Sequence, residues 1–193
     1  MSSNDRSLYE FVYRGQLTEQ ALDAAGRHGR HVGEDSSALR TTLNFDLLDT
    51  SDLDVSLRMA NVYAAVTAFE RSARRFIAKV LAGAHGDQWW STKVSERIRK
   101  FAEGRRDDED KVKWHGTRGD DPLTYTEMGH LAQIIEQNWT DFEPHILRVD
   151  WTKSIFATVE RSRNVIMHSG TLDGDDIERV GMSIRDWVRQ VGS

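Results

Sequence analysis

The sequence contains no cysteine and only two prolines among its 193 residues. The lack of cysteine excludes a disulfide scaffold, a thiolate zinc site and a cysteine nucleophile, and it fits a reducing compartment. The scarcity of proline leaves long stretches free to form helices, because proline breaks the helical hydrogen-bond ladder. Apolar residues make up 38% of the chain, which is enough for one folded core with an appendage.

Long apolar runs are also missing. No stretch approaches the roughly 20 apolar residues that a membrane-spanning helix needs. Residues 1–5 are polar, and the apolar positions that follow are interrupted by Glu10 and Arg14, unlike an export signal. These features predict a cytoplasmic protein without a membrane partner.

Motifs for common cofactors are absent as well. The seven histidines form no H-E-x-x-H or paired carboxylate–histidine pattern. The Gly-rich motifs that cradle phosphates, G-x-x-x-x-G-K-[ST] and G-x-G-x-x-G, do not occur, nor does the hydrolase elbow G-x-S-x-G. We therefore expect neither a metal nor a cofactor.

Apolar residues recur at intervals of three and four between loop-like patches, which is the helical period. Residues 26–37 have the Gly/Ser composition of a linker. Residues 34–52 suggest an extended or loosely helical connector. The charged block 105–110 suggests a solvent-exposed face. The pattern predicts an all-α fold with helices over residues 8–25, 53–84, 89–114, 124–138, 139–147, 150–168 and 173–191. Asp150 would cap the helix that begins there, and Ser169-Gly170 would end it.

Residues 160–170, E-R-S-R-N-V-I-M-H-S-G, carry the most distinctive polar pattern. On a helical wheel of about 100° per residue, Arg161, Asn164 and His168 share one ridge, whereas Arg163 projects from the apolar stripe. An arginine there needs a carboxylate partner, and Glu160 and Glu70 are the candidates. A purely structural account remains open, with Arg163 paired, Asn164 packed against a turn and His168 in the helix C-cap.

The string R-N-x-x-x-H, on a late helix and followed by a small-residue stop, resembles the signature of the HEPN superfamily of helical ribonucleases and nucleotide-binding modules. The matching residues are Arg163, Asn164 and His168. The upstream sequence is similar to that of the bacterial group related to the HEPN domain of the Swt-type RNA endonuclease. The matching residues are 122–125 (P-L-T-Y), His130-Leu131, Ile134-Ile135, Asn138-Trp139, Phe142, Phe69-Glu70 and Arg74-Arg75. The resemblance covers residues 53–193, and residues 1–52 match no known pattern.

The resemblance implies a helical bundle that forms a homodimer, with the motifs of both protomers facing one cleft. In catalytic members this arrangement cleaves RNA without a metal. His168 would transfer protons near neutral pH, and Arg163 would stabilise charge on the phosphoryl oxygens. Asn164 would orient the imidazole or bind the phosphate.

Three functional hypotheses follow. The first is a HEPN-type endoribonuclease, acting as a toxin or phage-defence effector with an antitoxin or defence-system protein as partner. The second is a non-catalytic HEPN module that binds RNA, a nucleotide or a partner protein, and the third is a helical interaction protein. Further arginines are candidates for RNA contact, although a solvated helix face explains them equally well: Arg161, Arg71, Arg74 and Arg75.

The net charge of −5 argues against RNA at first sight, since phosphate binding relies on Lys and Arg. Residues 1–52, however, hold five basic and nine acidic side chains, whereas residues 53–193 hold 21 and 22. We interpret residues 1–52 as an acidic arm and residues 53–193 as the HEPN-like domain. The arm is a candidate for covering the cleft.

Overall fold

The computed structural model describes residues 32–191, which consist of helices, turns and loops without a strand. The predicted all-α class is therefore confirmed. The helix expected over residues 8–25 and the first part of the linker lie outside the described residues. The chain divides into two compact units, Met1–Leu53 and Asp54–Ser193.

In the first unit, the helix α2 (Val32–Thr42) and the 3-10 turn η1 (Phe45–Leu47) replace the last part of the predicted linker and decide the extended or loosely helical connector in favour of helix. The hydroxyls of Thr41 and Thr42 bond carbonyls one turn back, at 3.2 and 3.0 Å, and Asn44 ends the helix with a left-handed φ of 51°. Gly33 and Ser36-Ser37 thus lie inside a helix, and their composition was misleading. Asp49 then accepts the backbone N–H of Ser51 at 2.8 Å and starts the next helix.

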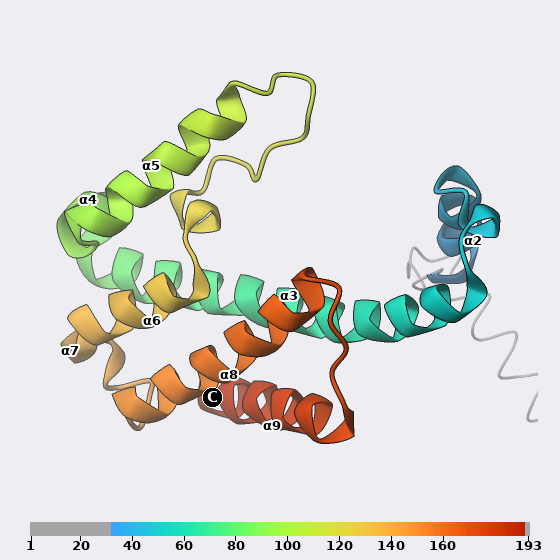
Figure 1. Ribbon diagram of the computed structural model, residues 1–193. Coiled ribbons are helices and arrows are strands. Elements are labelled where there is room, and N and C mark those ends of the chain that lie inside the picture. Colours follow the sequence, from blue (N-terminus) through green and yellow to red (C-terminus); the bar gives the residue numbers. More distant parts are fainter. Residues whose placement is uncertain (1–31, 192–193) are drawn as a thin grey trace, which may run out of the picture. The chain divides into compact units, whose positions relative to one another are not determined.

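That helix, α3 (Thr50–His85), confirms the long periodic stretch predicted over residues 53–84. Its buried side chains follow the helical period and supply one wall of the core: Met59, Val62, Val66, Phe69, Ala73, Ile77 and Leu81. Figure 1 shows α3 running past α6 and α8.

The single helix predicted over residues 89–114 is wrong. The 3-10 turn η2 (Gly86–Gln88) leads into α4 (Trp89–Lys93), and α5 (Glu96–Asp110) follows after a break at Val94-Ser95. The buried Asn138 amide donates to the carbonyl of Lys93 at 3.0 Å and fixes the break. α5 ends at Asp110, before the predicted end at residue 114. Four consecutive acids, residues 107–110, lie at its C-terminus, where the helix dipole is negative and their charges disfavour further helix.

The remaining elements are η3 (Pro122–Tyr125), α6 (Met128–Gln137), α7 (Trp139–Phe142), α8 (Val149–Met167) and α9 (Gly174–Val191). The helix predicted over residues 139–147 stops at Phe142, since Pro144 has no backbone N–H to continue the helical hydrogen-bond ladder. Asp150 does not cap α8: the N-cap is Arg148, and Asp150 lies in the first turn. Asp173 does cap α9, accepting the Asp176 N–H at 2.8 Å.

An aromatic cluster joins α3, α8 and α9. Trp187 of α9 is fully buried, and its ring meets those of Phe69, Phe76 and Phe156 edge-on, with centroids 5.9, 5.5 and 5.1 Å away. Such pairs add about 0.5–1.5 kcal/mol each to the burial of the rings. The cluster therefore sets the position of α8, which carries the R-N-x-x-x-H motif.

Trp187→Ala should lower the free energy of unfolding by about 3–5 kcal/mol, because it removes the centre of this cluster. Trp114→Ala is the matched control, since Trp114 is 86% exposed, and it should change stability by less than about 0.5 kcal/mol. Urea denaturation measures both. Equal effects of the two substitutions would show that the core is not organised around Trp187.

Candidate functional site

The C-terminal end of α8 is fixed by a Schellman motif. The N–H of Gly170 bonds the carbonyl of Val165 at 2.8 Å, and that of Ser169 bonds Ile166 at 3.0 Å. Ser169 has a left-handed φ of 60°, and a Cβ at Gly170 would lie 2.8 Å from the Val165 oxygen. The predicted small-residue stop is therefore confirmed, and it holds His168 as the exposed C-cap residue.

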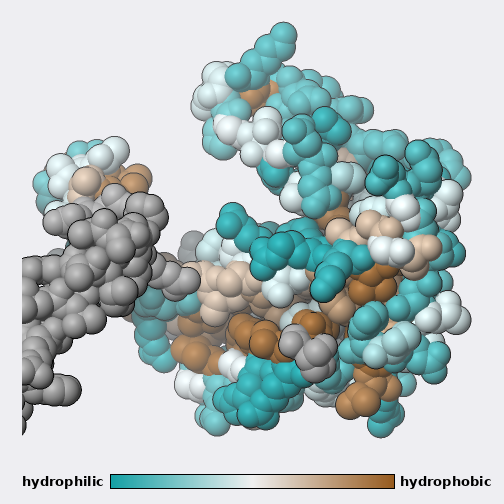
Figure 2. All heavy atoms as spheres, turned by 180° about the vertical axis from the view of Figure 1, so that it is seen from behind, coloured by the Kyte–Doolittle hydropathy of each residue, from teal (hydrophilic) through white to brown (hydrophobic). Residues whose placement is uncertain are grey.

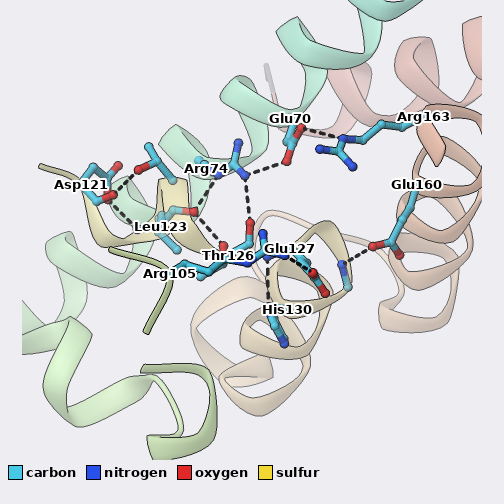
Figure 3. Close-up of polar contacts among 12 residues, drawn as sticks. Glu70, Arg74, Arg105, Asp121, Leu123, Thr126, Glu127, His130, Glu160 and Arg163 are labelled. Atoms are coloured by element: carbon cyan, nitrogen blue, oxygen red, sulfur yellow. Dashed lines mark hydrogen bonds and ion pairs between the residues drawn. The ribbon is translucent and has the colours of Figure 1, made fainter. Parts of the chain in front are cut away.

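Arg163 reaches from α8 toward α3 (Figure 3). Its Nε lies 3.9 Å from Oε2 of Glu70, and its Nη1 lies 3.5 Å from the amide oxygen of Asn164. Its side chain is 36% exposed. Glu70, the distant one of the two predicted carboxylates, is thus the partner of Arg163.

Glu160, the local candidate, points elsewhere. Its carboxylate accepts the N–H of Gly129 at 3.4 Å, at the N-terminus of α6, where a negative charge is favourable. The predicted Glu160–Arg163 ion pair is therefore wrong: the N-terminus of α6, brought against α8 by the fold, binds this carboxylate instead.

Glu70 is itself held in place by Arg74. The Arg74 guanidinium donates to Oε1 of Glu70 at 2.6 Å, to the carbonyl of Leu123 at 2.8 Å and to that of Thr126 at 3.2 Å. Both charged side chains are nearly buried, at 13% and 14% exposed. Arg74 therefore belongs to an internal network, whereas Arg71 and Arg75 remain on the exposed face of α3.

Two adjoining hollows carry the motif residues. A pocket of about 390 Å³, here called the motif pocket, is lined by Arg163 and Asn164 of α8 together with Glu70, Arg74, Arg105, Arg118, Thr124, Thr126, Glu127, Met128 and Glu160. A second, shallower hollow of about 580 Å³ contains Arg161, Asn164 and His168, as the ridge on the helical wheel predicts. Asn164 and Glu160 line both hollows, whereas Arg163 lines the first and His168 the second.

The N-terminus of α6 forms one wall of the motif pocket and contains a feature that the sequence analysis missed. Glu127 and His130 make a reciprocal capping box, in which Nδ1 of His130 accepts the N–H of Glu127 at 3.2 Å. Arg105 of α5 pairs with the Glu127 carboxylate at 2.7 Å and lies over the ring of Phe101, 4.7 Å from its centroid. The spacing E-x-x-H ahead of an apolar run was the available signal.

Within residues 32–191, no group of three or more His, Asp or Glu side chains is placed to hold a metal ion. The charged groups of the motif pocket are four arginines and three glutamates, and the arginines suit recognition of an anion such as a phosphate.

A family model described as Swt1-like HEPN matches residues 65–192, two thirds of the chain. The chain belongs to the Swt1-like HEPN family. The match includes the whole R-N-x-x-x-H segment and most of α3, so Glu70 and Arg163 both lie in the HEPN domain. No curated protein and no solved structure matches the chain. None of the helices between Val32 and Val191 is long and apolar enough to cross a membrane.

His130 gives the HEPN domain a pH-dependent stability. Burial lowers its pKa below the ordinary 6.5, an effect opposed by Glu127 and Glu160 and reinforced by Arg97 and Arg105. The unfolded chain therefore binds a proton more readily, so the contribution of neutral His130 is present above pH 6.5 and is lost as the pH falls.

His130→Gln should flatten this dependence, since glutamine can still accept the Glu127 N–H but does not titrate. We expect the loss of unfolding free energy between about pH 7.5 and about pH 5.5 to be smaller in this variant than in the wild type. His145→Gln, at an exposed histidine, is the control. An unchanged pH dependence in His130→Gln would contradict the account.

Proposed function

We propose that the HEPN domain is a metal-independent endoribonuclease in which Arg163, Asn164 and His168 act on the scissile phosphate. The observation that carries the proposal is the state of His168. Its side chain is exposed at the rigid end of α8 and makes no hydrogen bond or ion pair with any residue from 32 to 191. A structural histidine would be engaged, whereas a proton-transfer group must be accessible to substrate.

The chemistry is intramolecular transesterification. The ribose 2′-oxygen attacks the adjacent phosphorus, an O2′–P bond forms, the P–O5′ bond breaks, and the proton of the 2′-hydroxyl is finally carried by the 5′-oxygen. The products are a 2′,3′-cyclic phosphate and a 5′-hydroxyl. His168 suits the proton transfer because imidazole exchanges protons near neutral pH. A homodimer would supply a second His168, so that one imidazole accepts the proton of the 2′-hydroxyl and the other donates a proton to the 5′-oxygen.

Arg163 suits the stabilisation of charge on the phosphoryl oxygens. A guanidinium stays protonated and offers donors in a fork that matches phosphate geometry. The 3.9 Å separation from Glu70 is a loose contact that orients Arg163 while leaving donor groups for a ligand in the motif pocket. Asn164 would contact the phosphate or the imidazole, a role supported by its place in the lining of both hollows.

In this proposal RNA is the substrate and a homodimer is the working unit. A role as a toxin or phage-defence effector, with an antitoxin or defence-system protein as partner, would follow from RNA cleavage in the cell. A non-catalytic module that only binds RNA, a nucleotide or a protein is the alternative that the following assay separates.

Purified protein should cleave structured RNA in the presence of EDTA and leave 2′,3′-cyclic phosphate ends. His168→Ala should reduce the rate by about 10²–10⁴-fold, the usual size of a general acid–base contribution. Arg163→Ala should reduce it by about 10²–10³-fold, as loss of a transition-state donor does. Gel analysis of end-labelled RNA measures the rates.

Matched controls are His145→Ala and Arg185→Ala, which remove an exposed histidine and an exposed arginine that line neither hollow. Both should cleave at the wild-type rate. Cleavage that survives His168→Ala or requires a divalent metal would refute the mechanism, and RNA binding without cleavage would support the non-catalytic alternative.

A further inference from the structure

The loop between α5 and η3 has a composition unlike the rest of the chain. Its first nine residues, 111–119, K-V-K-W-H-G-T-R-G, contain three basic residues, a tryptophan and a histidine, and no acid, and the loop then ends in Asp120 and Asp121. Interleaved cations and aromatics are the combination that single-stranded nucleic acid requires, because the backbone is charged and every base has a face for stacking. The R-N-x-x-x-H motif does not involve this loop.

Trp114 is displayed to solvent. It is 86% exposed, more than any other large apolar side chain in the described part of the chain. Its ring touches only the neighbouring His115 among the described aromatic residues, edge-on with centroids 5.6 Å apart. A tryptophan presented in this way adds nothing to the core, and its indole face is available to a ligand.

The base of the loop is firmly held. Arg118 pairs with Glu109 at 2.9 Å, and its guanidinium lies 5.7 Å from the centroid of the Tyr125 ring. The buried Tyr125 donates its hydroxyl proton to the carbonyl of Gly119 at 3.0 Å. These contacts fix both ends of the loop, so Trp114 is presented from an anchored base.

The loop is also continuous with the motif pocket. A hollow of about 650 Å³ is lined by His115 and Val112 of the loop, by the acids Asp108 and Glu109, which pair with Lys111 and Arg118, and by Arg105 and Arg118, which line the motif pocket as well. A ligand could therefore pass from Arg163 along Arg105 and Arg118 to the loop without leaving a concave surface. Figure 1 shows α5 and the loop extending away from α3, and Figure 2 shows this part of the surface as largely hydrophilic.

We propose that residues 111–119 bind a segment of single-stranded RNA, with Trp114 stacking on a base and Lys111 and Lys113 contacting phosphates. The proposal rests on the proposed function, because it extends the RNA path from the scissile phosphate to a second contact. Lys111 reaches Asp108 at 2.7 Å on the exposed surface, a pair that a phosphate can replace at little cost. The three cations of residues 111–119, without an acid among them, and their continuity with the arginines of the motif pocket favour RNA over a protein partner.

The test is fluorescence anisotropy with a fluorescein-labelled single-stranded RNA oligonucleotide of mixed sequence. The protein is the full chain carrying His168→Ala, in EDTA, so that the probe stays intact. Trp114→Ala should weaken binding about tenfold at every salt concentration, and Trp114→Phe should restore most of the affinity, because stacking is not a charge effect. The double substitution of Lys111 and Lys113 by Ala should lower the slope of log Kd against log salt by about 1.4, or about 0.7 per phosphate contact.

Leu147→Ala is the control, since Leu147 is 82% exposed and lines none of these hollows. It should bind RNA like the parent, and thermal melting of all variants should stay within a few degrees of the parent. Parental affinity in Trp114→Ala, an unchanged salt slope in the lysine variant, or no RNA binding by the parent would overturn the proposal.

The two proposals fail separately. If the wild type does not cleave RNA but Trp114→Ala weakens binding, the loop binds RNA and the chemistry assigned to His168 is wrong. If the wild type cleaves and Trp114→Ala binds normally, the loop proposal alone is overturned, and a protein-docking role for Trp114 replaces it.

Discussion

The guanidinium of Arg74 joins the elements around the motif pocket. It binds the carbonyls of Leu123 and Thr126, at the two ends of the segment that leads from η3 into α6, and it holds the carboxylate of Glu70 on its own helix. A nearly buried arginine must satisfy its donors, and here two backbone oxygens and one carboxylate do so. Glu70 is thereby fixed in the orientation that meets Arg163 of α8. The position of the motif arginine therefore depends on a chain of contacts that starts outside α8.

This arrangement explains how a HEPN domain can keep a charged motif on a helix that also packs into the core. α8 buries Ile155, Phe156 and Val159, and the aromatic cluster around Trp187 sets its position. Arg163 projects from this apolar stripe toward Glu70, which balances its charge. The Schellman motif holds His168 at the end of the helix. Rigid supports of this kind matter because a displacement of about 1 Å can reduce a catalytic rate about 10²-fold.

The sequence predicted most of the helices and the motif, and two of its wrong predictions have a common cause. The helical period located α3, and the string from Arg163 to Gly170 located the motif, because both signals are local. The break at Val94-Ser95 was missed because Val94 and Ile98 continue the apolar period, while the contact that fixes the break comes from Asn138. Likewise, spacing alone placed Glu160 nearest to Arg163, but the N-terminus of α6 takes Glu160 and leaves Arg163 to Glu70. Both of these errors involve a partner far away in the sequence.

The central claim is that Glu70 positions Arg163 for catalysis. Steady-state cleavage by Glu70→Gln tests it most directly, since glutamine keeps an acceptor for Arg74 but removes the charge that orients Arg163. Glu70→Gln should remain folded with a lowered melting temperature, because Arg74 loses its ionic partner, and its kcat should fall at least about tenfold with no rise in KM, whereas Glu160→Gln retains most of its activity. Wild-type kcat in Glu70→Gln would contradict the claim.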